Sequence, residues 1–316
     1  MDTITISVVI VTYNFEKIIL ECLKSLESEL ENIYEIIISD DCSIDKTLEL
    51  CYQWKNKFKD KVRITILESK ENEGVVKNVN KGCRIAKGEW IKLLAGDDLL
   101  IKESIESIKK YIFLNKEAEI ICSKVIPFYE ENKKFIYLET LPKDSNFYYK
   151  DIKEQFEELL ENNCIVAPGV IIKNNLLKKM DYFDERFKMV EDYPFWIKAL
   201  KNNVKFYFLD KEIVLYRQSQ NSVSGKRLGQ KINKNILEFE IEFYKEIYSK
   251  EVKNPLKKWD KYISIKRKKI IFNSGNKSNL LTQMMRWLEV RNLKKYIFRI
   301  LLLIIVIKIY IEYFYK

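Results

Sequence analysis

The first 126 residues alternate short apolar runs with longer segments whose apolar residues recur at helical spacing. The run at 4–12 is rich in β-branched residues, which is typical of a strand buried on both faces of a parallel sheet. By the same criteria the sequence predicts strands at 4–12, 35–39, 62–67, 89–95 and 119–125, and helices at 16–30, 45–58, 74–86 and 102–114. This alternation predicts an α/β fold with a doubly wound sheet.

Polar clusters follow the predicted strands at the points where the strands end. They are Tyr13-Asn14, Asp40-Asp41, the segment 72–74 and Asp97-Asp98. In a doubly wound sheet, ligands bind beyond the carboxyl ends of the strands. We therefore expect these four loops to converge on one binding site.

The alternation loosens after Pro127. Helices are expected at 151–161 and 191–201, and strands at 169–172, 204–209 and 213–216, whereas helical patterns dominate from 226 onward. We expect an α/β domain over 1–225, with halves of about 1–126 and 127–225, followed by a helical region over 226–316.

The charge is divided unevenly along the chain. Residues 226–316 hold 22 Lys and Arg against 8 Asp and Glu, whereas residues 1–225 hold 34 against 38. A basic terminal region is typical of contact with nucleic acid or an anionic membrane, and a solvated lysine-rich surface is the alternative. We expect the inner membrane surface, and not nucleic acid, as its partner.

The chain contains no histidine, which excludes serine–histidine triads, histidine-ligated zinc and imidazole catalysis. The phosphate-binding loop, the GxGxxG fingerprint and the GxSxG motif are absent as well. Six scattered cysteines without a CxxC pair favour reduced thiols, and no secretory signal precedes the first strand. These features predict a cytoplasmic protein.

The segment 296–315 is apolar and aromatic but is interrupted by Arg299, Lys308 and Glu312. Its longest uncharged run, 300–307, is far shorter than the roughly 20 residues of a spanning helix. We expect a helix that lies on the cytoplasmic face of the membrane, with its cations reaching the headgroups. A helix packed on protein and a true span are the alternatives.

Asp97 and Asp98 directly follow the predicted strand at 89–95. Two carboxylates at a strand end are costly to desolvate unless a cation or hydrogen-bond donors compensate them. Mg²⁺ or Mn²⁺ provides such compensation, because these hard ions bind one or two carboxylates together with phosphate oxygens. The alternative is a cap for the following helix.

Two further loops carry candidate residues for binding a ligand. Asp40 and Asp41 are candidates for hydrogen bonds to a base or ribose, with a turn and helix cap as the alternative. The segment 72–74, which includes Asn72 and Gly74, opens a helix whose N–H groups favour anions, and Lys77 adds a cation there. A solvated lysine is an equally natural reading of Lys77.

Glu191 and Asp192 open the predicted helix at 191–201. Asp192 is a candidate general base on an acceptor hydroxyl, with Trp196 as a surface on which a sugar stacks. Carboxylates also gather at helix N-termini because of the dipole, and Trp196 is equally suited to the core. Arg217 is a candidate cation for a leaving diphosphate, or a surface residue at a strand end.

In order and spacing across 4–225, these motifs resemble those of family 2 glycosyltransferases. The resemblance depends on five segments taken together: 7–14, 39–45, 72–74 with 80–82, 95–98, and Glu191-Asp192. It implies a GT-A fold, an inverting mechanism, a nucleotide-sugar donor (a UDP-sugar), Mg²⁺ or Mn²⁺, and a glycan or glycolipid acceptor used in cell-surface polysaccharide or glycolipid synthesis. The nucleotide-sugar half is then about 1–126 and the acceptor half 127–225.

The resemblance also implies a role for each matching residue. Asp97 and Asp98 serve the ribose and the metal, with Asp98 favoured for the metal, and Asp192, beside Glu191, is the catalytic base. The remaining donor-site residues are Val11, Thr12, Tyr13, Asn14, Asp40 (which holds the base), Asp41, Asn72, Gly74 and Lys77.

The chain departs from the family pattern at two places. Ala95 stands where many members have a further aspartate, so the metal relies on fewer carboxylates. Gln218-Ser219 stands where many members have a histidine after the Tyr-Arg pair, which weakens the predicted leaving-group role of this loop. A sugar nucleotidyltransferase and a non-catalytic, membrane-docked scaffold are the competing interpretations.

Overall fold

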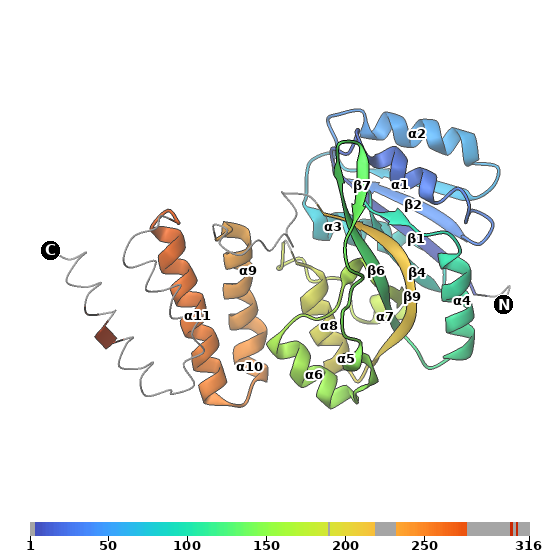
Figure 1. The fold of residues 1–316 in the computed structure, drawn as a ribbon. Coiled ribbons are helices and arrows are strands. Elements are labelled where there is room, and N and C mark those ends of the chain that lie inside the picture. The colour runs from blue at the N-terminus through green and yellow to red at the C-terminus, as the bar shows by residue number, and fades with distance from the viewer. Residues whose placement is uncertain (1–3, 189, 219–231, 277–303, 306–307, 309–316) are drawn as a thin grey trace. The chain divides into compact units, whose positions relative to one another are not determined.

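The computed structural model describes residues 4–188, 190–218, 232–276, 304, 305 and 308. The chain divides into two compact units, Met1–Lys226 and Arg227–Lys316. The first unit is built around one mixed sheet (Figure 1). Its strands are β1 (Ile6–Thr12), β2 (Glu35–Asp40), β3 (Arg63–Glu68), β4 (Trp90–Ala95), β5 (Leu99–Leu100), β6 (Ile120–Glu131), β7 (Lys134–Tyr137), β8 (Ile171–Lys173) and β9 (Phe206–Arg217).

The sheet has the order β3-β2-β1-β4-β8-β6-β9-β5, and β7 pairs with β6. β3, β2, β1 and β4 run parallel, whereas β8 is antiparallel to both of its neighbours, β4 and β6. β6 and β9 pair in parallel with register shifts around Lys124, and β5 pairs antiparallel to β9. The predicted doubly wound, mixed α/β sheet is confirmed.

Helices of the first unit cover both faces of the sheet, which explains why β1 is apolar on both sides. Ile6, Val8 and Ile10 belong to a core cluster together with Ile19 and Leu23 of α1. α3 packs against β1 and β2. The helices are α1 (Ile19–Ser25), α2 (Thr47–Phe58), α3 (Val75–Ile85), α4 (Ser104–Leu114), α5 (Asn146–Tyr149), α6 (Ile152–Glu161), α7 (Asn174–Lys179) and α8 (Asp192–Lys201), with a 3₁₀ turn η1 (Ala167–Gly169).

Gly82 allows α3 to approach β1 closely. A Cβ added at Gly82 would lie 2.5 Å from Cγ1 of Val9. This contact sets the distance between the helix and the sheet, and it explains the glycine of the motif at 80–82.

Several predicted boundaries are wrong. The helix expected at 16–30 is shorter, because α1 spans Ile19–Ser25 and turns follow it. The strand expected at 119–125 continues to Glu131, because β7 turns back and pairs with it. The strands expected at 204–209 and 213–216 form one strand, β9. The polar residues 210–212 interrupted the apolar pattern, although the backbone passes through them with a shift of register against β6.

In the second unit the structure describes α9 (Lys234–Phe243), a π-helical turn η2 (Tyr244–Tyr248), α10 (Ser249–Glu251) and α11 (Pro255–Asn273). The side chains of Asn233 and Asn254 cap α9 and α11 by accepting backbone N–H groups. The predicted membrane helix at 296–315 lies outside the described residues, except for Ile304, Ile305 and Lys308. Within the part of the chain that is described, no helix has the length and apolar character needed to cross a bilayer.

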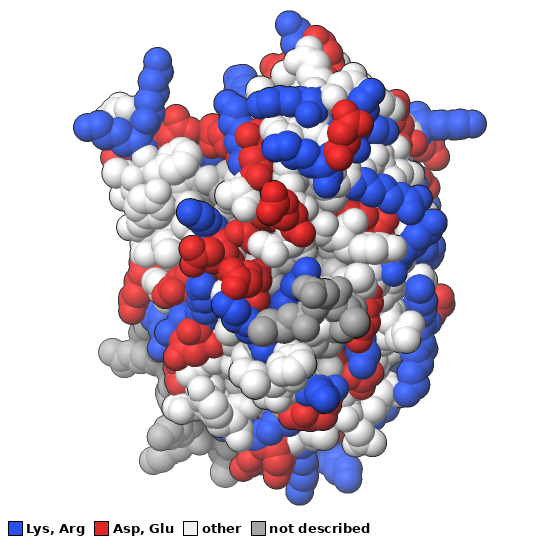
Figure 2. Space-filling model, turned by 90° about the vertical axis from the view of Figure 1, so that its right-hand side faces the viewer, with Lys and Arg blue, Asp and Glu red and all other residues white. Residues whose placement is uncertain are grey.

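Acidic and basic side chains are interspersed on the face drawn in Figure 2. This distribution agrees with the nearly balanced charge of residues 1–225, which hold 34 basic and 38 acidic side chains.

Candidate active site

The carboxyl ends of the first four strands lie level with one another. Thr12 pairs with Asp40, Asp40 with Glu68, and Val11 with Ala95. The loops that follow β1, β2, β3 and β4 therefore leave the sheet at one edge.

The loops after β1 and β2 are joined through Asn14 and Ser43. The N–H of Asn14 donates to Oγ of Ser43 at 2.8 Å, and Oδ1 of Asn14 accepts the N–H of Ile44 at 2.9 Å. Asn14 has a φ of 54°, a left-handed conformation that asparagine tolerates better than most residues. Tyr13 beside it is 40% exposed.

Asp40 is buried, and Ser43 donates a hydrogen bond to each of its two carboxylate oxygens. The N–H of Ser43 donates to Oδ1 at 2.7 Å, and the hydroxyl donates to Oδ2 at 2.5 Å. Burial raises the pKa of Asp40, and the two bonds from Ser43 act against that rise. Ser43 was not predicted as a site residue, although an aspartate at a helix N-cap often accepts the N–H three residues on, which is the separation of Asp40 and Ser43.

The carboxylate of Asp41 binds the backbone of the loop that leads into α3. Its two carboxylate oxygens accept the N–H groups of Glu73 and Gly74, each at 2.9 Å. The segment 72–74 was expected to offer free N–H groups to an anion, but Asp41 takes two of them. Lys77 is ion-paired with Glu73 at 3.4 Å, and Asn72 is exposed.

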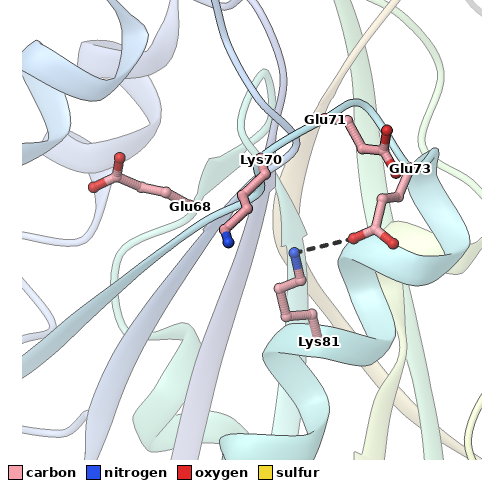
Figure 3. Close-up of a pocket in the computed structure, with 5 residues that line it drawn as sticks. All are labelled: Glu68, Lys70, Glu71, Glu73 and Lys81. Carbon is pink, nitrogen blue, oxygen red and sulfur yellow. Dashed lines mark hydrogen bonds and ion pairs between the residues drawn. The ribbon is translucent and has the colours of Figure 1, made fainter.

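A polar pocket of about 490 Å³ opens beside the loop after β3 (Figure 3). Within it, Nζ of Lys81 donates to Oγ of Ser69 at 2.6 Å and lies 3.3 Å from Glu73. The pocket is lined by Glu68, Lys70, Glu71, Glu73 and Lys81, none of which was predicted as a site residue.

Asp97 and Asp98 form a turn after β4, in which the N–H of Asp98 donates to the carbonyl of Ala95 at 3.0 Å. Asp98 is 2% exposed, and its Oδ1 accepts the backbone N–H of Arg217 at 2.8 Å. Burial raises the pKa of both carboxyls, and the charge of Asp97 adds to the rise at Asp98. Asp97 is only half-buried. Of these two candidate metal ligands, Asp97 is therefore the more accessible, and the preference for Asp98 stays a prediction.

Lys92 lies in β4 on the approach to this turn and is completely buried. Its ammonium donates to the carbonyls of Leu93, at 2.8 Å, and Pro168. Burial lowers the pKa of Lys92 to about 7, and the charge of Asp98 acts in the opposite direction. A lysine inside an otherwise apolar strand is the sequence signal that could have identified this residue.

Arg217 reaches the same turn from the end of β9. Its Nε donates to the carbonyl of Asp97 at 2.9 Å, and Nη2 donates to Glu21 at 2.5 Å. The side chain is 8% exposed, so Arg217 is not the surface residue of the alternative reading. Its guanidinium is directed at protein groups in this structure, which does not fit the predicted role at a leaving diphosphate.

Glu191 and Asp192 begin α8, the first as N-cap and the second inside the first turn. Burial raises the pKa of both carboxyls; that of Glu191 rises to about 8, with the charge of Asp192 as the second cause. Nε1 of Trp196 donates to Oδ2 of Asp192 at 3.3 Å. Asn163 also hydrogen-bonds to Asp192 and acts against the rise of its pKa.

The prediction that Trp196 stacks on a sugar is corrected. Trp196 is 1% exposed, and its ring makes edge contacts with Phe195 and Phe206 at centroid distances of 5.6 and 5.7 Å. Trp196 does lie one helical turn after Asp192, as the spacing predicts. Its ring is part of the core, however, and its N–H is the group that contacts the carboxylate of Asp192.

Five of the predicted residues thus fall into two connected groups. One joins Asn14 with Asp40 through Ser43, and the other joins Asp97 and Asp98 with Arg217. Asp192 makes its described contacts with Trp196 and Asn163. Across the part of the chain that the structure describes, no three acidic or cysteine side chains come together as a metal site.

The chain is similar to known proteins over most of this unit. The family model described as glycosyl transferase family 2 matches residues 7–180. An uncharacterised glycosyltransferase of Methanocaldococcus jannaschii is 31% identical over 223 residues, which cover 69% of this chain and 72% of that protein. TarS of Staphylococcus aureus, a poly(ribitol-phosphate) β-N-acetylglucosaminyltransferase, is 28% identical over 217 residues, which cover 66% of this chain but only 35% of TarS.

A third relative is the minor teichoic acid biosynthesis protein GgaB of Bacillus subtilis, 27% identical over 72% of this chain and 24% of GgaB. Among solved structures, that of residues 1–349 of TarS matches with a TM-score of 0.56 and 22% identity, covering 84% of this chain and 70% of that chain. The complex of the same fragment with UDP matches with a TM-score of 0.56 and 24% identity, covering 83% and 69%. These structural matches show a GT-A fold.

Proposed function

Because the chain belongs to glycosyl transferase family 2 and is therefore a glycosyltransferase, we propose that it moves a sugar from a UDP-sugar to an acceptor hydroxyl with inversion. The acceptor class is a cell-surface glycan, polyol-phosphate polymer or glycolipid. Two relatives support this class: TarS, which is named for glycosylation of poly(ribitol-phosphate), and GgaB, which is named for minor teichoic acid biosynthesis. The observation that carries the proposal is the Asp97–Asp98 turn, which leaves β4 level with the carboxyl end of β1.

The donor half is assigned to about 1–126. Val11 and Thr12 end β1, and Tyr13, which follows the strand and is partly exposed, offers a stacking surface to the nucleobase. Asp40, oriented by Ser43, is the proposed acceptor of a hydrogen bond from the base. Asn14 and Asp41 shape the loops around it, since both bind backbone groups of neighbouring loops.

A divalent cation fits the Asp97–Asp98 turn. Two desolvated carboxylates with raised pKa values leave negative charge that needs compensation, and a hard ion takes one or two of them together with phosphate oxygens. Asp97 is the proposed ligand, while Asp98 keeps its bond to the N–H of Arg217. When bound, Mg²⁺ or Mn²⁺ would stabilise negative charge on the departing diphosphate.

Asp192 is the proposed general base. It would take the proton of the acceptor hydroxyl while the hydroxyl oxygen attacks the anomeric carbon from the face opposite the diphosphate. The N–H of Trp196 holds the carboxylate in place, and burial raises the pKa of the neighbouring Glu191, which favours the neutral form of Glu191 beside Asp192. General-base assistance of this kind contributes roughly 10²–10⁴-fold to the rate.

The acceptor half is assigned to 127–225, and the helical region 226–316 to the cytoplasmic face of the membrane. α11 supports this assignment, since it carries seven basic residues against one acidic residue and exposes Trp259 and Tyr262. Aromatic and basic side chains together are typical of helices that lie at a membrane interface. Sedimentation with anionic vesicles before and after deletion of 296–316 tests whether the tail is the anchor, and unchanged sedimentation would contradict it.

The assay for the activity is transfer or hydrolysis of UDP-sugars by the purified chain with Mn²⁺. Release of UDP that depends on Mn²⁺ and is lost in Asp192→Asn is the expected result. Release of pyrophosphate from UTP and a sugar phosphate would instead indicate a nucleotidyltransferase. Failure of every nucleotide sugar to bind or to raise the Tm would favour a scaffold.

A further inference from the structure

We propose that Arg217 is a positioning residue that fixes the Asp97–Asp98 turn, rather than a residue that contacts the leaving diphosphate. The inference rests on the proposed function, and it assigns to Arg217 a role that acts through its neighbours. Arg217 donates two hydrogen bonds to this turn.

Arg217 holds the turn at two points. Its backbone N–H donates to the carboxylate of Asp98 at 2.8 Å, and its Nε donates to the backbone carbonyl of Asp97 at 2.9 Å. The strand pairing continues this contact, because β5 begins directly after the turn and pairs with β9 through Leu99 and Leu215. The turn is therefore anchored to β9 on one side and to β4 on the other.

The remaining guanidinium nitrogens face other protein groups. Nη2 donates to Glu21 of α1 at 2.5 Å, and Nη1 lies 3.8 Å from a carboxylate oxygen of Glu130. The guanidinium carbon lies 4.6 Å from the ring centroid of Phe128 and 5.4 Å from that of Phe135, both on the β6–β7 hairpin. Contact with a phosphate would require Arg217 to give up at least one of these partners.

This geometry explains why an arginine is needed. A planar guanidinium presents several donors in a fixed fork, so one side chain can hold the carbonyl of Asp97 and the carboxylate of Glu21 at once. A lysine keeps the charge but offers a single flexible ammonium. Loss of groups that orient metal ligands typically weakens metal affinity by about 10–100-fold.

The experiment compares Arg217→Gln and Arg217→Lys with the wild type. Mn²⁺ affinity is measured in the presence of UDP by electron paramagnetic resonance, UDP affinity without metal by calorimetry, and kcat and KM with the UDP-sugar that the wild type uses. Arg63→Gln is the matched control, because Arg63 lies at the amino end of β3 and is more than half exposed.

Both Arg217 variants are expected to weaken Mn²⁺ binding at least about tenfold and to lower kcat, while UDP binding without metal stays within about twofold. Glu21→Gln, a change at a partly exposed site on α1, is expected to act in the same direction with a smaller effect. It provides the test should the Arg217 variants fail to fold. Arg63→Gln is expected to match the wild type.

A contact with the diphosphate gives the opposite pattern. Arg217→Lys would then retain most activity, and UDP binding without metal would weaken in Arg217→Gln. That result, or unchanged Mn²⁺ affinity in the Arg217 and Glu21 variants, overturns the inference. Absence of UDP binding to the wild type would instead reject the proposed function itself.

Discussion

The carboxylate of Asp41 accepts the N–H of Gly74 at 2.9 Å, and this bond fixes the start of α3 against the end of β2. The second oxygen accepts the N–H of Glu73 at the same distance. Gly74 has a φ of 90°, so glycine permits the backbone to turn both N–H groups toward one carboxylate.

Replacing Asp41 by alanine is expected to destabilise the fold by about 1–2 kcal/mol, because two N–H groups lose their buried acceptor. This corresponds to a fall in Tm of roughly 2–8 °C for a domain of this size. Calorimetry checks the value, with Asp60→Ala as a control at an exposed site after α2. Equal Tm values for the two variants would contradict the capping role.

Gly82→Ala is expected to destabilise the fold by about 1–3 kcal/mol, because the new methyl group would overlap Cγ1 of the buried Val9. The helix must then move away from the sheet or Val9 must change rotamer. Gly82→Ala combined with Val9→Ala should recover part of the loss in chemical denaturation. Additive losses in the double variant would show that this contact is not the cause.

The pattern of apolar and polar residues predicted the features that depend on residues close together in the sequence, such as the bounds of the strands. Strands β1 to β4 were each placed within two residues of their observed bounds, because a strand covered on both faces is apolar throughout. The contact between Asp98 and Arg217 joins residues 119 positions apart, and periodicity carries no information on it. The choice between a sugar-stacking and a core position for Trp196 stayed open for a similar reason, since Phe206, against which it packs, comes from another element.

Asp192→Asn is expected to lower the rate of transfer by roughly 10²–10⁴-fold while leaving affinity for UDP nearly unchanged. The amide can still accept the N–H of Trp196 but cannot take a proton at neutral pH. Steady-state kinetics and calorimetry with UDP separate the two effects. Retention of full activity would remove Asp192 from the mechanism.

Glu191→Gln is expected to stabilise the protein at high pH. The folded pKa of Glu191, about 8, lies above its ordinary value, so folding favours the protonated form. Wild-type stability is then highest below the ordinary pKa and is lost progressively as pH rises through about 8. The glutamine cannot ionise, so the difference in Tm between variant and wild type should grow from pH 5 to pH 9. A constant difference would show that Glu191 does not titrate in this range.

Asp97→Asn and Asp98→Asn are expected to differ, because the two carboxylates have different partners. Asp98 is 2% exposed and accepts the N–H of Arg217 through one oxygen, a bond that the carbonyl oxygen of asparagine can also accept. Asp97 is more accessible, and an amide at this position removes the negative charge offered to a cation. Asp97→Asn should therefore weaken Mn²⁺ binding about 10–100-fold, whereas Asp98→Asn should lower it less and shift the Tm more. Mn²⁺ titration in the presence of UDP, together with thermal unfolding of both variants, measures the two effects. If Asp98→Asn weakens Mn²⁺ binding more than Asp97→Asn does, Asp98 is the main metal ligand. Accessibility and the bond to Arg217 would then not determine which carboxylate binds the ion.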